Sequence, residues 1–518
     1  MNILSVILPI ILLASLILDY LYALKKETSF EIVRKMGMGY NLAFTFDSFS
    51  YADLETPDEQ IGLNGNIAPT KDMIKKIKKY GFKTIRFPVT WMNFIDDKGN
   101  IKSEWMIRVK EIIDIITKED LFCILNVHND GYNQNWLAKG MEVKDKYINL
   151  WSQIANEFKD YNEYLIFESM DAVVFYDYIN YTYDYTVLTN LNQAFVDTIR
   201  NSGGNNIDRL LIIAGAEDDL ESTCSPKYNM PVDISNKLAV SIHYFAPYEF
   251  VYDLYYEPYN WTDNEGYEST FGPKLVWGDS RDYHQMFVNF ELMKSYFVDK
   301  GIPIIISEVG VYTEERKRIE SIREYLYMLF SFSSDYDGIM CCLWDTSNKI
   351  YGKMNFYDRT NDIWYDKKIK DNFLQISRGK YIKPKEYYIN TTFESTDAYY
   401  YIGAYSISFG TRKVLKIIIN ARFTGVLFVD CNFGIYTIDN NRKVTKISFG
   451  KENSKKQYDG THIFTIDVSK TDCNSYVEVA VTKGMKFITL NNLTLEFEES
   501  FLSLDYKSLK NAISNYIN

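Results

Sequence analysis

The sequence predicts an α/β protein, a (β/α)8 TIM barrel followed by a smaller C-terminal all-β sandwich. Between residue 37 and about residue 380, short apolar segments alternate with stretches of helical periodicity, which favours a barrel. After Ile382 the pattern changes to alternating segments separated by Gly, Asn and Asp turns, which is typical of an antiparallel sandwich. A doubly wound open sheet is the structural alternative, but no G-x-G-x-x-G follows the first strand.

The length and composition agree with two folded units behind a leader. The chain has 518 residues, of which 24% are charged and 46% hydrophobic. Its net charge of -12 disfavours binding to nucleic acid or to an anionic membrane surface. We expect a barrel over residues 30–380, a sandwich over residues 383–500 and a helical tail over residues 501–518, where Leu502, Tyr506 and Leu509 recur at helical spacing.

Residues 1–23 resemble a secretory signal peptide. Ile3–Leu18 is almost entirely apolar, and small Ala23 stands just ahead of two lysines. The run is slightly short for a spanning helix, so an uncleaved anchor is the less favoured alternative. We therefore expect a secreted, extracellular protein, or a cell-surface one if the leader stays attached, with no other membrane contact.

Eight apolar segments are the expected barrel strands. They are Gly37–Phe46, Thr84–Pro88, Phe122–Val127, Tyr164–Met170, Arg209–Ala214, Leu238–Tyr244, Pro303–Ser307 and Gly338–Trp344. Apolar residues between them recur at helical spacing, as in Met73/Ile74/Ile77/Tyr80, Met106/Val109/Ile112/Ile113/Ile116 and Phe287/Phe290/Met293/Phe297. The later segments Val414–Ile419, Gly425–Val429, Ile435–Ile438, Ile463–Val468 and Val477–Val481 are the expected sandwich strands.

The cysteines and histidines predict neither a dense disulfide framework nor a structural metal. Cys123, Cys341 and Cys342 lie in apolar strand patterns, where a free thiol acts as a small hydrophobe. Cys431 and Cys473 are the pair that merits a test for a bridge. No CxxC or HExxH spacing occurs and the four histidines are scattered, so we expect no metal and no cofactor.

The segment Pro303–Gly310 is the most informative strand. Four apolar, mostly β-branched residues run into Ser307 and Glu308, and Gly310 breaks the strand. An unbroken apolar run suits a strand covered on both faces. Its carboxylate stands at the C-terminal end, where barrel enzymes carry their chemistry.

The carboxyl ends of the other strands carry further polar and aromatic residues in a fixed order. They read Gly39-Tyr40-Asn41-Leu42, Arg86-Phe87-Pro88-Val89-Thr90-Trp91, Asn126-Val127-His128-Asn129-Asp130, Phe167-Glu168-Ser169-Met170-Asp171-Ala172, His243-Tyr244-Phe245-Ala246-Pro247, Ser307-Glu308-Val309-Gly310 and Leu343-Trp344-Asp345. Over about residues 37–365 this order resembles glycoside hydrolase family 5, the large cellulase and mannanase family. The resemblance implies a glycosidase barrel acting on a polysaccharide, most simply a β-glucan.

The resemblance also implies roles for individual residues. Glu308 matches the nucleophile that forms a covalent glycosyl-enzyme, and Arg86 matches the arginine that keeps this carboxylate ionised. His128, His243 and Trp344 match residues that line the sugar site. Taken alone, each has a plainer explanation as a core histidine, core packing or a structural ion pair.

Several positions depart from the family pattern. Where members have Asn-Glu-Pro, with Glu as the general acid/base, this chain has Asp171-Ala172-Val173, and Ala172 holds no proton. Phe245 replaces the tyrosine of the His-x-Tyr motif, and Asn129 replaces the second histidine of a His-His pair. If Asp171 and Glu308 share one pocket, we expect them to repel and one pKa to rise.

Three functional hypotheses follow. The first is a secreted family 5-like protein that binds β-glucan but hydrolyses it poorly or not at all, because the acid/base position holds Ala172. The second is an active retaining endo-β-1,4-glucanase or mannanase with a relocated acid, either Asp171 or Glu217; Glu168 is expected to lie deeper, in the barrel core. The third is a surface or scaffold glycan-binding protein whose sandwich binds the glycan, with Tyr399-Tyr400-Tyr401 as a stacking platform.

Overall fold

The computed structural model describes the barrel region and the strands that follow it. The described residues are 27–381, except 134, 178–181, 253–258, 263–267, 272–274, 279, 314–316 and 348–352, together with strands β15 to β24 between Thr391 and Asp505. The proposed leader, Cys431, Cys473 and the Tyr399–Tyr401 run lie outside them. None of the helices in this described part is long and apolar enough to cross a membrane.

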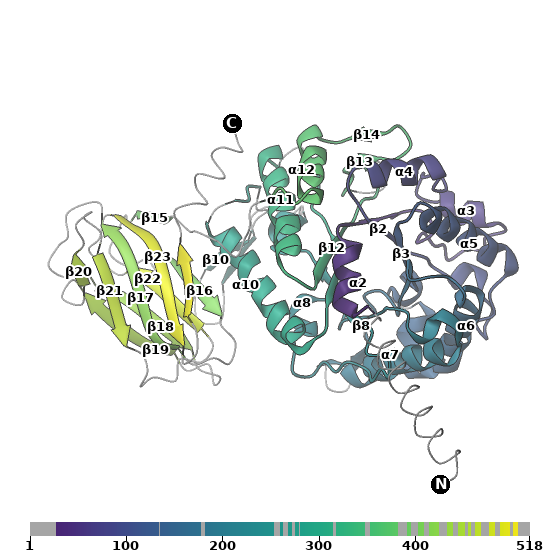
Figure 1. Cartoon of the computed structure of the whole chain (residues 1–518), viewed down its shortest axis with the longest axis horizontal. Helices are drawn as coiled ribbons and strands as arrows, with labels where there is room; N and C mark the ends of the chain where they lie inside the picture. The colour runs from purple at the N-terminus through teal and green to yellow at the C-terminus, as the bar shows by residue number, and fades with distance from the viewer. Residues whose placement is uncertain are drawn as a thin grey trace, which may run out of the picture.

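Eight parallel strands close into a barrel in the order β1-β12-β11-β8-β7-β4-β3-β2 (Figure 1). Their bounds are β1 Gly39–Asn41, β2 Thr84–Phe87, β3 Phe122–Asn126, β4 Leu165–Glu168, β7 Leu211–Ile213, β8 Leu238–Tyr244, β11 Ile304–Val309 and β12 Ile339–Leu343. Each lies at its expected place, so the predicted barrel is confirmed. Strand β11 runs two residues beyond the predicted end at Ser307.

Helices surround the strands (Figure 1). They are α2 Ser29–Met36, α3 Pro57–Gly62, α4 Lys71–Lys79, α5 Ser103–Lys118, α6 Lys144–Phe158, α7 Tyr185–Asn201, α8 Leu220–Thr223, α9 Tyr248–Val251, α10 Ser280–Tyr296, α11 Ile319–Asp335 and α12 Lys367–Ser377. Three antiparallel hairpins are added in the loops: β5 Tyr176–Asp177 with β6 Thr182–Tyr183, β9 Tyr259–Thr262 with β10 Glu268–Phe271, and β13 Tyr357–Asp358 with β14 Ile363–Trp364.

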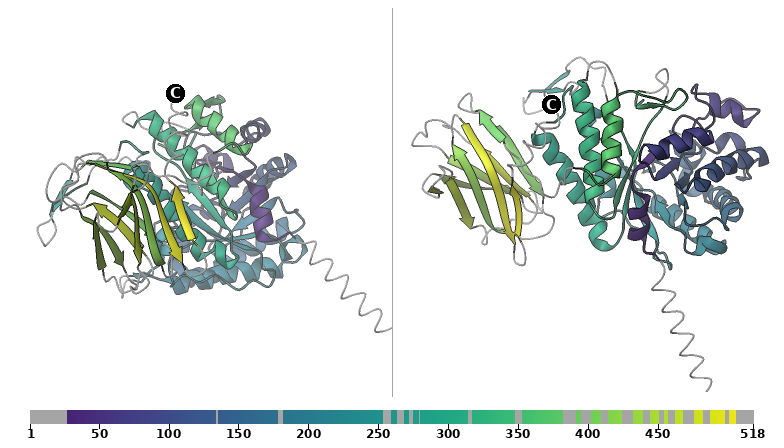
Figure 2. Two further views of the ribbon diagram at one scale, coloured as in Figure 1. Left: turned by 60° about the vertical axis from the view of Figure 1, so that its left-hand side comes forward. Right: turned by 45° about the horizontal axis from the view of Figure 1, so that its top comes forward.

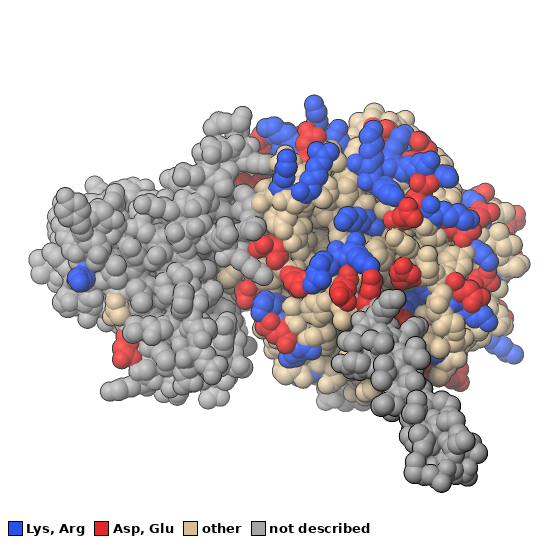
Figure 3. Space-filling view, viewed as in Figure 1, with Lys and Arg blue, Asp and Glu red and all other residues tan. Residues whose placement is uncertain are grey.

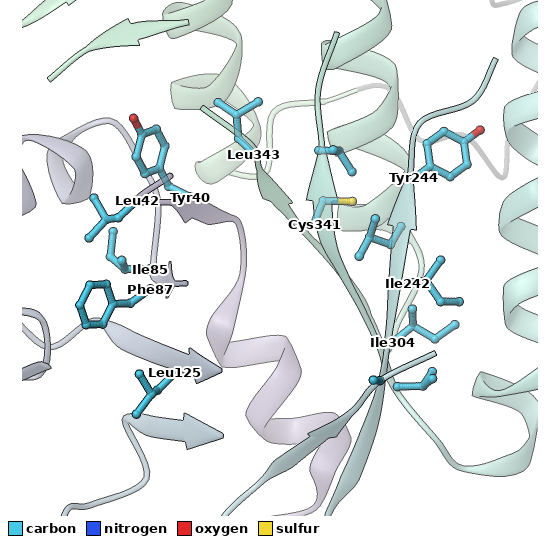
Figure 4. Packing of buried hydrophobic residues seen from close by; sticks show 14 of the residues in the cluster. Tyr40, Leu42, Ile85, Phe87, Leu125, Ile242, Tyr244, Ile304, Cys341 and Leu343 are labelled. Carbon is cyan, nitrogen blue, oxygen red and sulfur yellow. The ribbon is translucent and has the colours of Figure 1, made fainter. Parts of the chain in front are cut away.

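Alternate strand residues form two separate apolar layers. Ile85, Phe87 and Leu125 belong to the large cluster between the strands and the surrounding helices (Figure 4). Their neighbours, such as Ile124, belong to a second cluster that includes residues of α2. Because successive strand side chains point to opposite faces, this second cluster fills the barrel interior.

Helix α2 covers the floor of the barrel. Ile32, Val33 and Met36 are buried among the interior residues of β3, β4, β8, β11 and β12. A reciprocal capping box between Thr28 and Glu31 fixes the start of the helix, because each side chain accepts the other residue's backbone N–H. The N-terminal end of the barrel is therefore closed by apolar packing, and the polar chemistry lies at the opposite end.

The C-terminal region forms two antiparallel sheets, as expected for a sandwich. One has the order β15-β23-β17-β21-β20 with β24 on β23, and the other is β16-β22-β18-β19. The bounds are β15 Thr391–Glu394, β16 Ile402–Ser408, β17 Val414–Phe423, β18 Asn432–Ile438, β19 Val444–Gly450, β20 Ser454–Lys456, β21 His462–Asp467, β22 Tyr476–Val481, β23 Phe487–Phe497 and β24 Phe501–Asp505. The expected strand Gly425–Val429 lies outside the described residues. The two sheets lie beside α10 (Figures 1 and 2), which contacts β16.

The predicted helical tail is wrong at its start. Phe501–Asp505 is strand β24, and it pairs antiparallel with β23. The apolar residues of this stretch fit a period of two as well as a helical period over so short a length, and pairing with β23 satisfies the backbone. Residues 506–518 lie outside the described part.

The surface of the barrel carries mixed charges, and the predicted thiols lie in its interior. In the view of Figure 3, basic side chains gather over the upper part of the barrel with acidic ones among them. Lys76, for example, pairs with Asp72 at 2.8 Å. Cys123, Cys341 and Cys342 are buried free thiols, as predicted.

Candidate active site

Glu308 faces the barrel axis because β11 contains a β-bulge. The pairing register with β8 shifts between Ile306 and Glu308, so Ser307 is an extra residue. A bulge bends the strand and re-aims its side chains. The hydroxyl of Ser307 lies 2.7 Å from that of Ser241 inside the barrel. The next residue, Glu308, also points inward and contacts an arginine at the centre of the barrel end.

That arginine, Arg86 on β2, binds three carboxylates. Its Nε donates to Glu168 Oε2 and its Nη1 to Glu308 Oε1, both at 2.7 Å. Its Nη2 donates to Asp171 Oδ1. Arg86 and Glu168 are completely buried, so the predicted contact between Arg86 and Glu308 is present and Glu168 lies in the barrel core as expected.

The predicted aromatic and histidine residues meet above this arginine. Nε2 of His128 lies 3.3 Å from Glu308 Oε1 and 3.4 Å from Asp171 Oδ2. The His128 ring stacks on half-buried Trp344, with centroids 5.7 Å apart and planes 7° apart. Nε2 of His243 lies 3.5 Å from Asp171 Oδ1. Chain segments more than 200 residues apart thus converge on one pocket at the C-terminal ends of the strands.

The charges in this pocket compensate one another. Burial alone raises the pKa of Glu308, but the positive charge of His243 and the contacts with His128 and Arg86 hold it below its usual range. The same balance lowers the pKa of Asp171 well below its ordinary value, against the effect of burial, through His128 and Arg86. Burial lowers the pKa of His243, yet Glu308 and Asp171 raise it to about 10.

The expected rise of one of these two pKa values is therefore wrong. The positive charge of His243 acting on Glu308, and that of His128 acting on Asp171, together with Arg86, outweigh the mutual repulsion of the two carboxylates. The pKa that does rise belongs to a third carboxylate, Asp218. Burial, together with the charges of Asp171 and Glu168, raises the pKa of Asp218 to about 7, against the effect of the charge of His243.

Residue 172 has a methyl side chain and an anchored backbone. The Ala172 N–H donates to Asp218 Oδ2 at 2.8 Å, and Gly215 N–H donates to Oδ1 of the same carboxylate at 2.7 Å. Ala172, Glu217 and Asp218 all have left-handed backbone, with φ of 40°, 55° and 48°. Such strained residues cluster at functional sites, and here they join the loops after β4 and β7.

Sequence reasoning missed Asp218 and Tyr252. Asp218 stands beside Glu217, which the sequence did single out, but no spacing rule shows that its carboxylate reaches back to residue 172. Phe245 packs edge-on against His243 and beside Tyr252, with centroids 6.0 and 5.4 Å apart. Burial raises the pKa of Tyr252, and the charge of Glu308 raises it further, so this tyrosine lies near the nucleophile position.

Glu217 remains a partly exposed carboxyl on the loop that holds residue 172. Burial and the neighbouring charge of Asp219 raise its pKa. Asp171 is different, since its ion pair with Arg86 and its lowered pKa keep it ionised. Of the two positions considered for a relocated acid, Glu217 is the one whose pKa is raised and not lowered.

Comparison with known proteins identifies the family. The profile described as Cellulase (glycosyl hydrolase family 5) matches residues 46–350, which is more than half of the 518-residue chain. This chain belongs to glycosyl hydrolase family 5. The predicted resemblance is thereby confirmed.

Other members of family 5 match both in sequence and in structure. The chain is 31% identical over 371 residues to endoglucanase A of Clostridium longisporum, covering 68% of this chain and 66% of that enzyme. It is 32% identical over 308 residues to endoglucanase A of Paenibacillus barcinonensis, covering 55% and 74%.

Solved family 5 structures give the same result. A broad specificity endoglucanase from an uncultured bovine rumen ciliate is 52% identical, with a TM-score of 0.65 over 68% of this chain and 99% of that one. A complex of a Caldicellulosiruptor sp. F32 lichenase with cellotetraose is 27% identical, with a TM-score of 0.60 over 68% and 96%. The family 5 barrel is therefore shared with these endoglucanases and this lichenase.

Proposed function

We propose that this family 5 chain binds a β-glucan at the C-terminal end of its barrel and hydrolyses it slowly or not at all. The observation that carries the proposal is the pairing of a retained Glu308 with a methyl group at residue 172. A retaining glycosidase needs two carboxyl groups about 5–5.5 Å apart, one to attack and one to protonate the leaving oxygen. Here the attacking group is held by Arg86 at 2.7 Å, and the second group is absent from its place.

The described carboxylates in contact with the site do not replace it. Asp171 is ionised by its ion pair with Arg86 and has no proton to give. Glu168 is completely buried beneath the arginine. Asp218 is also completely buried, and its two oxygens accept backbone N–H groups. General acid help is worth roughly 10²–10⁴-fold in rate, and an unactivated glycoside leaves badly without it.

The parts that bind a sugar remain. Trp344 is half-buried and stacked on His128, so its ring is rigid and offers an apolar face to a pyranose. The lichenase complex named above contains cellotetraose. We therefore take cellotetraose as the probe. Trp344→Ala is expected to weaken its binding about tenfold, as measured by calorimetry.

One experiment tests the chemistry directly. The protein is incubated with an aryl cellobioside that bears a good leaving group, with and without azide. Attack by Glu308 releases the aryl group as a phenolate without an acid, and azide then takes the glycosyl group from Glu308. Azide-dependent turnover that disappears in Glu308→Gln supports a nucleophile without its acid. Cleavage of unmodified cellulose or mannan at ordinary enzymatic rates contradicts the proposal.

A working hydrolase with a relocated acid is the second candidate. The observation in its favour is Glu217, which is partly exposed, has a raised pKa and lies next to the residue that anchors Ala172. Hydrolysis of soluble β-glucan that disappears in Glu217→Gln, and persists in Asp219→Asn, would establish it. Asp219 is the matched control because it is the exposed carboxylate two residues along the same loop.

We also propose that the protein acts outside the cell. Polysaccharides of this class are too large to be taken up whole, and the apolar run of residues 3–18 has the length of a signal peptide. N-terminal sequencing of secreted protein tests this, with a first residue shortly after Ala23 expected.

A further inference from the structure

Three side chains in the pocket present ligand atoms of the kind that bind a transition metal. The atoms are His128 Nε2, a carboxylate oxygen of Asp171 and a carboxylate oxygen of Glu308, all within 4.8 Å of one another. They come from the ends of β3, β4 and β11, so the scattered histidines of the sequence gave no sign of them. We propose that His128, Asp171 and Glu308 form a zinc-binding site inside the sugar pocket.

The two distances from His128 fit tetrahedral coordination, and the two carboxylate oxygens lie within 4.8 Å of each other. With Zn–N and Zn–O bonds of about 2.0–2.1 Å, the ligands of a tetrahedral site lie about 3.3–3.4 Å apart. His128 Nε2 lies 3.3 Å from Glu308 Oε1 and 3.4 Å from Asp171 Oδ2. One imidazole with two carboxylates suits zinc, whereas calcium and magnesium prefer oxygen ligands alone. Three protein ligands leave a fourth position for water.

The local charge favours a cation. Glu168, Asp171 and Glu308 contact one permanent cation, Arg86. These three carboxylates, set against Arg86 and the positive charge of His243, still leave a net negative charge, which favours a cation over an anion. One of the three carboxylates is a departure from the family pattern, because Asp171 stands where the resemblance places an asparagine. The site is thus specific to this chain's substitution.

The ligands are held in position before any metal arrives. Arg86 donates to Asp171 Oδ1, and Oδ2 of the same group faces His128. The His128 ring is 5% exposed and stacked on Trp344, so its orientation is fixed. A second imidazole is near: Nε2 of His243 is buried without a hydrogen-bond partner, 3.5 Å from Asp171 Oδ1.

A zinc ion here changes what Glu308 can do. An oxygen bound to zinc is a poor nucleophile toward a sugar carbon, so metal binding and attack by Glu308 exclude each other. Zinc binding does not depend on glycan binding or on residual hydrolysis, and it can be measured in their absence. Its failure would leave the proposed function untouched, and the reverse also holds.

The test uses the full chain and metal ions alone. Cobalt(II) is added to the metal-free protein, and zinc is then added to displace it. We expect one saturable site with the intense visible absorption bands of four-coordinate cobalt, lost on adding one equivalent of zinc. Asp171→Asn is expected to weaken binding at least tenfold and to keep the barrel folded, because asparagine is the residue that the resemblance places there.

Two further variants distinguish this site from incidental binding. Glu308→Gln keeps the size of the side chain and is expected to weaken binding at least tenfold, whereas His462→Ala, on strand β21 of the C-terminal sheets, is expected to have no effect. The absence of a saturable site in the unaltered chain would overturn the proposal. So would cobalt bands that are unchanged by Asp171→Asn or Glu308→Gln.

Discussion

Single residues decide the chemistry of this pocket, and its cationic side chains decide the charges. His243 and His128, together with Arg86, keep Glu308 and Asp171 ionised at once, and Arg86 contacts the two carboxylates through separate nitrogen atoms. In a family 5 site with an asparagine at position 171, the arginine would have one carboxylate fewer to compensate. Under the proposed function, Ala172 lacks a proton donor and Asp171 adds an anion, so hydrolysis is expected to return only when both positions are changed.

The triple variant Asp171→Asn, Ala172→Glu, Phe245→Tyr is expected to regain hydrolysis. It restores a proton donor, removes the added anion and returns a hydroxyl beside the nucleophile. We expect the rate of cellotetraose hydrolysis, measured by the release of reducing ends, to rise by roughly 10²-fold or more. The control replaces Ala172 with Gln in the same background, which keeps the shape without the proton. Equal rates in the two variants would contradict the missing-acid explanation.

Asp218 is expected to make barrel stability depend on pH. Its folded pKa of about 7 lies above that of an unfolded Asp, about 3.9, so the folded state binds the extra proton between these values. This proton stabilises the folded state. The stabilisation is fully present below the pKa of the unfolded chain and is lost as the pH rises through 7. The free energy of unfolding of the unaltered chain should therefore fall between pH 5 and pH 8.5. Asp218→Asn mimics the neutral form, so over the same range its free energy of unfolding should fall by roughly 1–3 kcal/mol less.

Tryptophan fluorescence measures this change in the barrel alone. The eight tryptophans all lie between residues 91 and 364. The control is Asp219→Asn, which retains a helix-capping residue at the start of α8. Parallel pH profiles for the unaltered chain and Asp218→Asn would show that burial does not hold a proton on this carboxyl.

Most of these residues were predictable, and the exceptions have a physical reason. Arg86, His128, His243, Glu308 and Trp344 each follow a recognisable apolar strand, so their order carries information. Asp218 lies in a loop whose left-handed backbone brings its carboxylate back to residue 172, and neither property follows from a periodic pattern. The charge balance was missed because it depends on three carboxylates meeting one arginine.

At the scale of the elements, the strands were predicted and their irregularities were not. The apolar run of β11 indicated a strand, but a period of two says nothing of an inserted residue, so the bulge at Ser307 was invisible. The same limit explains β24, whose five residues fit two periods equally well. Helix α2 was not expected as the floor of the barrel, because its eight residues look like any short amphipathic helix.

The packing of α2 into the barrel floor is expected to stabilise the fold. Met36 is completely buried among the interior residues. Met36→Ala should lower the free energy of unfolding of the barrel by about 2–5 kcal/mol, because it leaves a cavity that rigid strands cannot fill. Denaturant unfolding followed by tryptophan fluorescence measures this. Lys35→Ala, exposed on the same helix, should have little effect, because the ion pair of Lys35 with Glu27 lies at the surface. Similar losses in the two variants would mean that the floor is not packed as described.

At the scale of the whole molecule, the barrel is complete without the C-terminal sheets. Its eight strands close on one another, and every residue of the pocket lies between Arg86 and Trp344. The change of periodicity after Ile382 predicted the division, whereas the way that β16 meets α10 had no sequence signal. This division separates glycan binding by the pocket from binding by the sandwich, which was the third hypothesis.

A truncated chain ending at residue 381 is expected to bind cellotetraose as the full chain does. Because the described residues of the pocket all precede residue 345, the dissociation constant should change by less than about twofold in calorimetry. A tenfold or larger loss would assign the binding to the C-terminal region. Retention of residues 383–518 alone on insoluble cellulose is the complementary measurement, with no retention expected.

The bulge in β11 couples the position of Glu308 to the closure of the barrel. The same backbone shift that aims Glu308 also carries the pairing of β11 with both of its neighbours, β8 and β12. This shift cannot be lost without disturbing the sheet, so the place of residue 308 is kept whether or not the pocket turns over a substrate. A carboxylate in this place is therefore weak evidence of turnover, and surveys for inactive relatives should weigh the loops after β4 and β7 instead.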